Sequence, residues 1–166
     1  WKMNKKILLI SCLTLIVDQI SKAIVDIMMQ VGQSIPVIKN FFYITYYQNS
    51  GAAWGIFSNN NTLIIILSFI ILLIIYRYMY SFKTNTRNVI AFGLLFGGII
   101  GNLCDRLLFE HVKDFLDFYI GSYNFPIFNF SDMAIVIGIF LLIIAILKKE
   151  EVNERDKSRK RSEKNR

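Results

Sequence analysis

A polar segment set within long apolar runs begins with GGIIGNLCDR at residues 97–106. It continues with VKDF at residues 112–115 and ends with FNFSD at residues 128–132. Together the three pieces carry three aspartates, one arginine and two asparagines. Ionisable side chains are costly at membrane depth, so they are functional candidates wherever they occur there. We therefore expect these polar residues to meet at one functional centre.

The apolar runs around this segment predict the fold class. They cover residues 7–29, 63–80, 89–109 and 127–147, in a chain of 166 residues that is 54% hydrophobic. Runs of this length and composition are long enough to cross a bilayer. The sequence predicts an all-α integral membrane protein with four transmembrane helices. Residues 3–149 would form one membrane domain and residues 150–166 a charged cytoplasmic tail. Trp1 and Lys2 precede Met3 and are expected to lie outside the fold.

The segment between the first two runs has a different character. Gly32 and Pro36 are expected to break the helix, and residues 37–47 are rich in β-branched and aromatic residues. This composition predicts short strands at the membrane surface, a small extracytoplasmic β-rich cradle. The sequence QNSGAAWG follows at residues 48–55. Its small residues would let the backbone approach a ligand closely, but the residues themselves favour an ordinary turn.

Polar residues in two of the runs follow helical spacing. Gly93, Gly97 and Gly101 recur every four residues and predict close packing against a neighbouring helix. Asp105 continues this row, and its neighbour Arg106 is expected to hold it ionised. In the first run, Asp18 and Lys22 are spaced i,i+4 and can pair on one helix face. A neutralised structural pair is favoured there over direct chemistry.

The distribution of positive charge predicts the topology. Fifteen of the 19 Lys and Arg residues lie at residues 2–6, 77–87 and 148–166. All fall on one side if the chain crosses four times with both ends together, and the positive-inside rule places that side in the cytoplasm. The excess of cations is thus attributed to topology, and no nucleic-acid partner is expected. The polar residues then converge at the external membrane face: Lys22, Asn102, Asp105, Arg106, Asp114, Asn129 and Asp132.

Aspartates are the groups left to carry chemistry at this site. His111 is the sole histidine, and Cys12 and Cys104 lie in apolar runs, so we expect neither a metal site nor a cofactor. Two close carboxylates share a proton, and such a pair can activate water against an amide carbonyl. Intramembrane carboxylates also line ion and proton pathways. The residues by themselves leave a peptidase and a transport or channel subunit equally open.

Five segments in order resemble the lipoprotein signal peptidases (signal peptidase II), bacterial membrane enzymes that process prolipoproteins. They are DQISK at residues 18–22, NSGAAW at 49–54, GNLCDR at 101–106, VKDF at 112–115 and FNFSD at 128–132. The resemblance covers about residues 5–147 and agrees with the expected four spans. It favours a peptidase over a transport subunit, as do the almost wholly apolar cytoplasmic halves of the predicted helices.

The resemblance implies an aspartic endopeptidase in the bacterial cell membrane, with Asp114 and Asp132 as the catalytic pair. Supporting roles would fall to Asp18, Lys22, Asn49, Gly51, Asn102, Asp105, Arg106 and Asn129. The implied substrate is a prolipoprotein, cleaved before a cysteine that carries diacylglyceryl while its lipid stays in the bilayer. Cyclic peptide inhibitors such as globomycin are implied as ligands, and residues 49–61 could cover the site.

Two positions depart from the family pattern. Lys113 stands where a valine is usual, and Ser131 stands where an alanine is usual. Neither departure removes a catalytic group, although Lys113 has to point away from Asp114 if that carboxyl is to share a proton.

Overall fold

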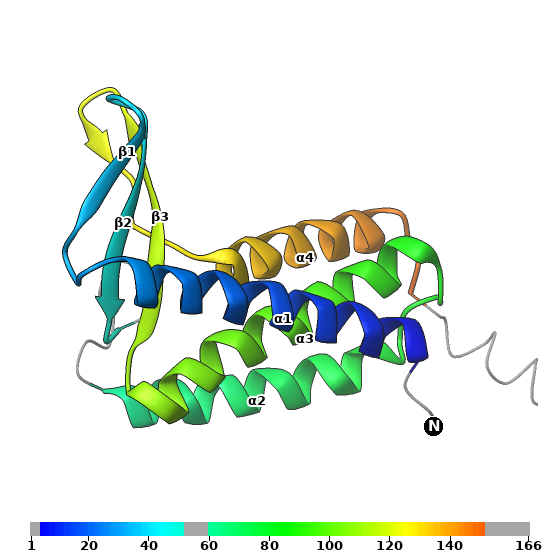
Figure 1. Ribbon diagram of the computed structural model, residues 1–166. Coiled ribbons are helices and arrows are strands. Elements are labelled where there is room, and N and C mark those ends of the chain that lie inside the picture. Colours follow the sequence, from blue (N-terminus) through cyan, green and yellow to red (C-terminus); the bar gives the residue numbers. More distant parts are fainter. Residues whose placement is uncertain (1–3, 52–59, 152–166) are drawn as a thin grey trace, which may run out of the picture.

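Four long helices form the membrane part of the protein, for which the computed structural model describes residues 4–51 and 60–151 (Figure 1). They are α1 (Lys5–Met28), α2 (Asn61–Met79), α3 (Thr86–Phe109) and α4 (Phe130–Leu147). Each is long and apolar enough to cross a membrane. The predicted four-helix fold class is confirmed. Most of the expected covering loop and of the charged tail lies outside the described residues.

Helix α3 is the central helix of the bundle, buried along most of its length between α1 and α4. Its glycines make this packing possible. A Cβ atom on Gly97 would lie 2.7 Å from the Ser11 carbonyl oxygen of α1, and one on Gly98 would lie 2.6 Å from the Ser131 carbonyl oxygen of α4. These distances are shorter than real Cβ contacts, so only glycine fits. The predicted close packing of the glycine row is confirmed.

The outward faces of the other helices are apolar and exposed. Examples are Leu9 on α1, Leu73 on α2 and Phe140 on α4. An apolar face that no protein element covers is what a lipid environment requires of a spanning helix.

An antiparallel sheet lies at one end of the helix bundle (Figure 1). Its strands are β1 (Ser34–Ile38), β2 (Phe42–Asn49), β3 (Val112–Ile120) and β4 (Tyr123–Asn124), paired in that order. Strands β1 and β2 confirm the strands expected within residues 37–47. Strand β3 lies between the third and fourth apolar runs, where no strand was predicted. It forms because its β-branched and aromatic residues pair with β2, with Tyr47 opposite Asp114.

The two ends of the described chain meet at the other end of the bundle (Figure 1). Glu150, where the expected tail begins, accepts a hydrogen bond from the Asn85 side chain at 2.8 Å and pairs with Arg87. Its carbonyl oxygen also accepts a bond from the Lys83 amide. The connection between α2 and α3 is thereby fastened to the end of α4.

Candidate active site

Helix α4 begins with a capping box that positions Asp132. The Asn129 side chain accepts a hydrogen bond from the Asp132 amide at 3.0 Å, and the Asp132 carboxylate accepts one from the Asn129 amide at 3.1 Å. The apolar run at residues 127–147 predicts a helix that would include both residues. The helix instead starts at Phe130, because the Asn129 side chain satisfies a free amide of its first turn. Phe128 therefore lies outside the helix, and its backbone pairs with Leu116 of β3.

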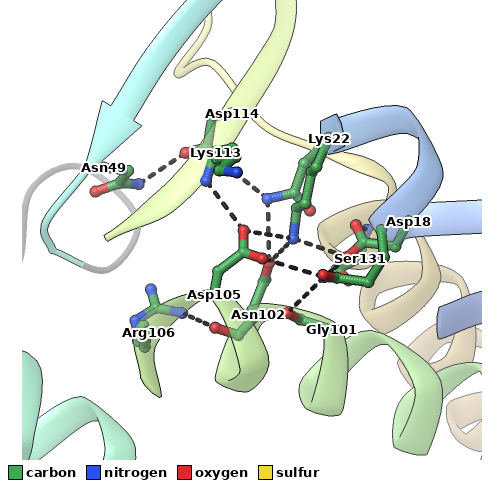
Figure 2. Close-up of polar contacts among 12 residues, drawn as sticks. Asp18, Lys22, Asn49, Gly101, Asn102, Asp105, Arg106, Lys113, Asp114 and Ser131 are labelled. Atoms are coloured by element: carbon green, nitrogen blue, oxygen red, sulfur yellow. Dashed lines mark hydrogen bonds and ion pairs between the residues drawn. The ribbon is translucent and has the colours of Figure 1, made fainter. Parts of the chain in front are cut away.

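Asn129 also reaches the second carboxylate of the site. Its side-chain amide donates to Asp114 Oδ1 at 2.6 Å, and the Asn49 amide donates to Asp114 Oδ2 at 2.9 Å. The contact between Asn49 and Asp114 can be followed in Figure 2. Since Asn129 bonds both Asp114 and Asp132, one residue holds the two carboxylates on the same side of the site. Both line a cavity of about 570 Å³.

The electrostatic environment of Asp114 suits a group that exchanges a proton near neutral pH. Burial, and after it the negative charge of Asp132, raise the pKa of Asp114 to about 7. Hydrogen bonds from Asn49 and Asn129 oppose this rise because they favour the ionised form. A carboxyl group with such a pKa can be both a proton donor and a proton acceptor at neutral pH.

Lys22 is the buried cation at the centre of the polar network (Figure 2). Its ammonium lies 2.8 Å from Asp18, 3.2 Å from Asp105 and 2.9 Å from the side-chain oxygen of Asn102. The predicted pairing of Asp18 with Lys22 is confirmed. An ammonium only donates hydrogen bonds, so it orients the Asn102 amide with its oxygen toward Lys22. The nitrogen of that amide then donates to Asp132 Oδ1 at 2.8 Å.

Asp105 and Arg106 have different partners from those expected. The cation that neutralises Asp105 is Lys22, and the Gln19 side chain donates to the same carboxylate at 3.1 Å. Arg106 instead donates to the carbonyl oxygens of Gly51, at 2.9 Å, and Asn102, at 3.3 Å. Consecutive side chains on a helix point about 100° apart, which explains why these neighbours do not pair.

Arg106 links the small-residue segment to the site. The Gly51 carbonyl accepts from Arg106, and the Gly51 amide donates to the Asn49 side-chain oxygen at 2.9 Å. That bond leaves the Asn49 nitrogen free to donate to Asp114. The described part of the segment, through Gly51, therefore orients a group that touches Asp114.

The structure joins all the site residues predicted from the sequence into one hydrogen-bonded network. Asp18 completes it by accepting a bond from the Ser131 amide at 2.9 Å. Gln19 is a member that sequence reasoning missed, since its amide contacts Asp18, Asp105 and the Gly101 carbonyl. The sequence feature that could have identified Gln19 is its position, as a polar residue within an apolar run and next to Asp18. Within the described residues, the buried Ser131 hydroxyl has no hydrogen-bond partner.

Known proteins resemble this chain in sequence and in fold. A family model described as Signal peptidase (SPase) II matches residues 10–148. A solved structure described as a bacterial membrane enzyme, determined by the in meso method at 2.3 Å resolution, is 41% identical, with a TM-score of 0.78; the match covers 86% of this chain and 87% of that one. A second structure with the same description, at 1.9 Å resolution, is also 41% identical, with a TM-score of 0.76, covering 86% and 92%.

Proposed function

Because this chain belongs to the signal peptidase II family, we propose that Asp114 and Asp132 are its catalytic pair. The protein is an aspartic peptidase that cleaves signal peptides from prolipoproteins. The assignment of the pair is supported by one observation above others: Asn129 hydrogen-bonds both carboxylates at the wall of a single cavity.

The pair can carry out hydrolysis with one shared proton. The ionised carboxylate takes a proton from a water molecule as that water attacks the carbonyl carbon of the scissile amide. The protonated carboxyl donates to the carbonyl oxygen, where negative charge develops. In the second step one carboxyl group passes its proton to the leaving nitrogen as the C–N bond breaks, and the other, ionised carboxylate takes a proton from a hydroxyl of the tetrahedral intermediate. The pKa of Asp114, about 7, allows both roles near neutral pH.

The walls of the cavity favour a lipid-modified substrate. Its polar part consists of Asp114, Asp132, Asn49, Asn102 and Arg106. Apart from Val112 of β3, the apolar side chains belong to α4 and to the segment before it: Phe125, Pro126, Ile127, Phe128, Met133, Ile135, Val136 and Ile137. Several of these side chains are exposed along the outer face of α4, where acyl chains in a bilayer would lie. A diacylglyceryl group could then stay in the membrane while the peptide bond just before its cysteine reaches the carboxylates.

We extend the proposal to the orientation of the protein in the membrane and to the other molecules that bind at its cavity. Both chain ends would face the cytoplasm of a bacterial cell and the site would face outward, where exported precursors arrive. Membrane lipid would border the cavity, and cyclic peptides such as globomycin would compete for it. Residues 150–166 would form the charged cytoplasmic tail.

The test of the catalytic pair is a cleavage assay on a diacylglyceryl-modified precursor with purified protein in detergent. Asp114→Asn and Asp132→Asn should each lower the rate by about 100-fold or more, because each removes a group that transfers a proton. Activity should survive EDTA. Asp117→Asn is a matched control. Asp117 lies on the same strand, but its carboxylate accepts a hydrogen bond from the Thr45 hydroxyl and does not line the cavity. Near-normal cleavage by a folded Asp114→Asn or Asp132→Asn protein would refute the assignment.

A further inference from the structure

Lys113 lies next to Asp114 in β3, but its side chain points to the opposite face of the strand. Successive side chains of a strand alternate between its two faces, so a lysine can stand beside a catalytic carboxyl without touching it. The Lys113 ammonium lies 2.7 Å from Asp26 Oδ2 on α1 and 4.1 Å from the centre of the Phe109 ring. Its side chain is only 8% exposed. The expectation that Lys113 points away from Asp114 is met by this specific pairing.

A second strand is fastened to the same carboxylate. The Tyr46 hydroxyl on β2 donates to Asp26 Oδ1 at 2.5 Å, and Tyr46 is almost completely buried. Burial and the Asp26 carboxylate both raise the pKa of Tyr46, so this hydroxyl keeps its proton and remains a donor. Asp26 thus uses one oxygen for each strand and ties the end of α1 to β2 and β3.

The backbone of Lys113 is held as well. Its amide donates to Asp105 Oδ2 at 3.2 Å, and Asp105 is itself paired with Lys22. The residue that precedes Asp114 is therefore fixed through its backbone by α3 and through its side chain by α1. The position of Asp114 relative to Asn129 on α4 depends on where these contacts hold the strand.

We propose that Lys113, Asp26 and Tyr46 form a latch that positions Asp114 for catalysis from the far side of β3. The inference rests on the proposed catalytic role of Asp114. Members of the latch touch neither the cavity nor the second carboxylate, so they are positioning residues. Opening the latch lets β3 shift relative to α4, and displacements of about 1 Å at reacting groups lower rates by as much as 100-fold.

The latch also fixes the position of the Lys113 ammonium, whose positive charge Asp26 neutralises. The charged and titratable groups around Lys113 are Asp26 on α1, Tyr46 on β2 and Asp105 on α3, with His111 just before β3. The charged groups that act on Asp114 are Asp132, Lys22 and Arg106. If Asp26 is neutralised, the Lys113 ammonium becomes an uncompensated cation one residue from Asp114, and a nearby cation favours an ionised carboxyl.

The experiment compares Asp26→Asn, Lys113→Met, Tyr46→Phe and the double variant Asp26→Asn/Lys113→Met in the cleavage assay. We expect each single variant to lower kcat about tenfold, with KM within about twofold, since substrate contacts are intact. The double variant should be no worse than the poorer single one, because both changes break the same contact. Lys113→Arg keeps the pairing and should retain most of the activity.

The pH profile separates positioning from a general loss of stability. Asp26→Asn should move the alkaline limb of kcat/KM to lower pH, because it leaves the Lys113 charge uncompensated. Lys113→Met removes that charge and leaves Asp26 negative, so the limb should not move to lower pH. Glu150→Gln is the matched control, since it breaks the ion pair with Arg87 at the other end of the bundle. It should lower Tm without changing kcat or the pH profile.

Three outcomes overturn the latch, and one overturns the catalytic assignment on which it rests. Latch variants that behave as Glu150→Gln does, with lower Tm and unchanged kcat, would show that the contacts only stabilise the fold. Additive losses in the double variant would show that Asp26 and Lys113 act separately. If Asp114→Asn is itself active, the catalytic assignment fails whatever the latch variants do. If the Asp114 variant is inactive and the latch variants keep full kcat, only the latch is wrong.

Discussion

Asn129 carries two functions that rest on different atoms of one side chain. Its oxygen caps α4 by accepting from the Asp132 amide, and its nitrogen donates to Asp114 and to the Asn102 oxygen. The cap stabilises the helix, while the nitrogen orients a carboxyl group. A substitution that keeps one atom and removes the other can therefore separate stability from activity.

Substitutions at Asn129 test this separation. Asn129→Ala removes both functions and should lower stability by about 1 kcal/mol, the usual value of a cap, as well as activity by about tenfold or more. Asn129→Ser keeps a capping oxygen and should recover most of the stability but not the activity. Thermal unfolding in detergent and the cleavage assay measure the two effects. Full activity in the serine variant would show that the contact with Asp114 is dispensable.

The pH dependence of cleavage should report the proton on Asp114. Its pKa is raised to about 7 by burial, so the shared proton is present below that pH and is lost above it. We expect kcat/KM to be highest near or below pH 7 and to fall about tenfold per pH unit well above it. The unfolded carboxyl has the lower pKa, so stability from this group is lost as pH rises from about 4 to about 7. A rate that stays constant to pH 9 would contradict this prediction.

At the scale of the elements, α3 determines how close the other helices can come. Gly93 and Gly97 face α1, and Gly98 faces α4. These close approaches bring Lys22 within reach of Asn102 and Asp105, and they bring Asp132 within reach of Asn102. The geometry of the site is therefore a consequence of backbone packing along a helix that carries only part of it.

Gly97→Ala tests the importance of this packing. The added Cβ would lie 2.6 Å from the Thr14 Cβ and 2.7 Å from the Ser11 carbonyl oxygen, so α1 and α3 must separate. Overpacking of this kind costs about 1–3 kcal/mol, and Tm in detergent should fall accordingly. Ile90→Ala, on a more exposed part of the same helix, is the control and should change Tm little. Equal Tm values for the two variants would mean that the helices do not pack as closely as described.

For the whole molecule, the sheet and the site lie at one end of the bundle and the described chain ends lie at the other (Figure 1). This arrangement agrees with four crossings that return the chain to its starting side. The orientation itself is a prediction from charge, since 15 of the 19 Lys and Arg residues belong to the side of the chain ends.

Cysteine labelling tests the orientation in intact cells. In a background without Cys12 and Cys104, cysteine at Ser50 or Asn60, both exposed, should react with a membrane-impermeant thiol reagent added outside. Cysteine at Ser158, in the expected tail, should react only after the membrane is opened. Labelling of the tail from outside, with both loop positions protected, would place the site in the cytoplasm. The processing of exported precursors would then be excluded.

The amino-acid sequence alone determined the helices, the family and most of the residues that meet at the site. A bilayer demands long apolar runs with satisfied backbones, so four such runs predict four helices without knowledge of their packing. The site residues could be named because polar groups are conspicuous within apolar runs and because five motifs occur in order.

The tertiary structure decided which of these residues touch. Asp114 lies on a strand because β3 pairs with β2, more than 60 residues earlier in the chain. Asp105 is neutralised by Lys22 rather than by its neighbour Arg106, and Lys113 is turned to Asp26. Periodicity and local spacing report the direction of a side chain on its own element only. The residues that a side chain contacts on other elements depend on how closely those elements pack and in what register. No local sequence pattern contains this information.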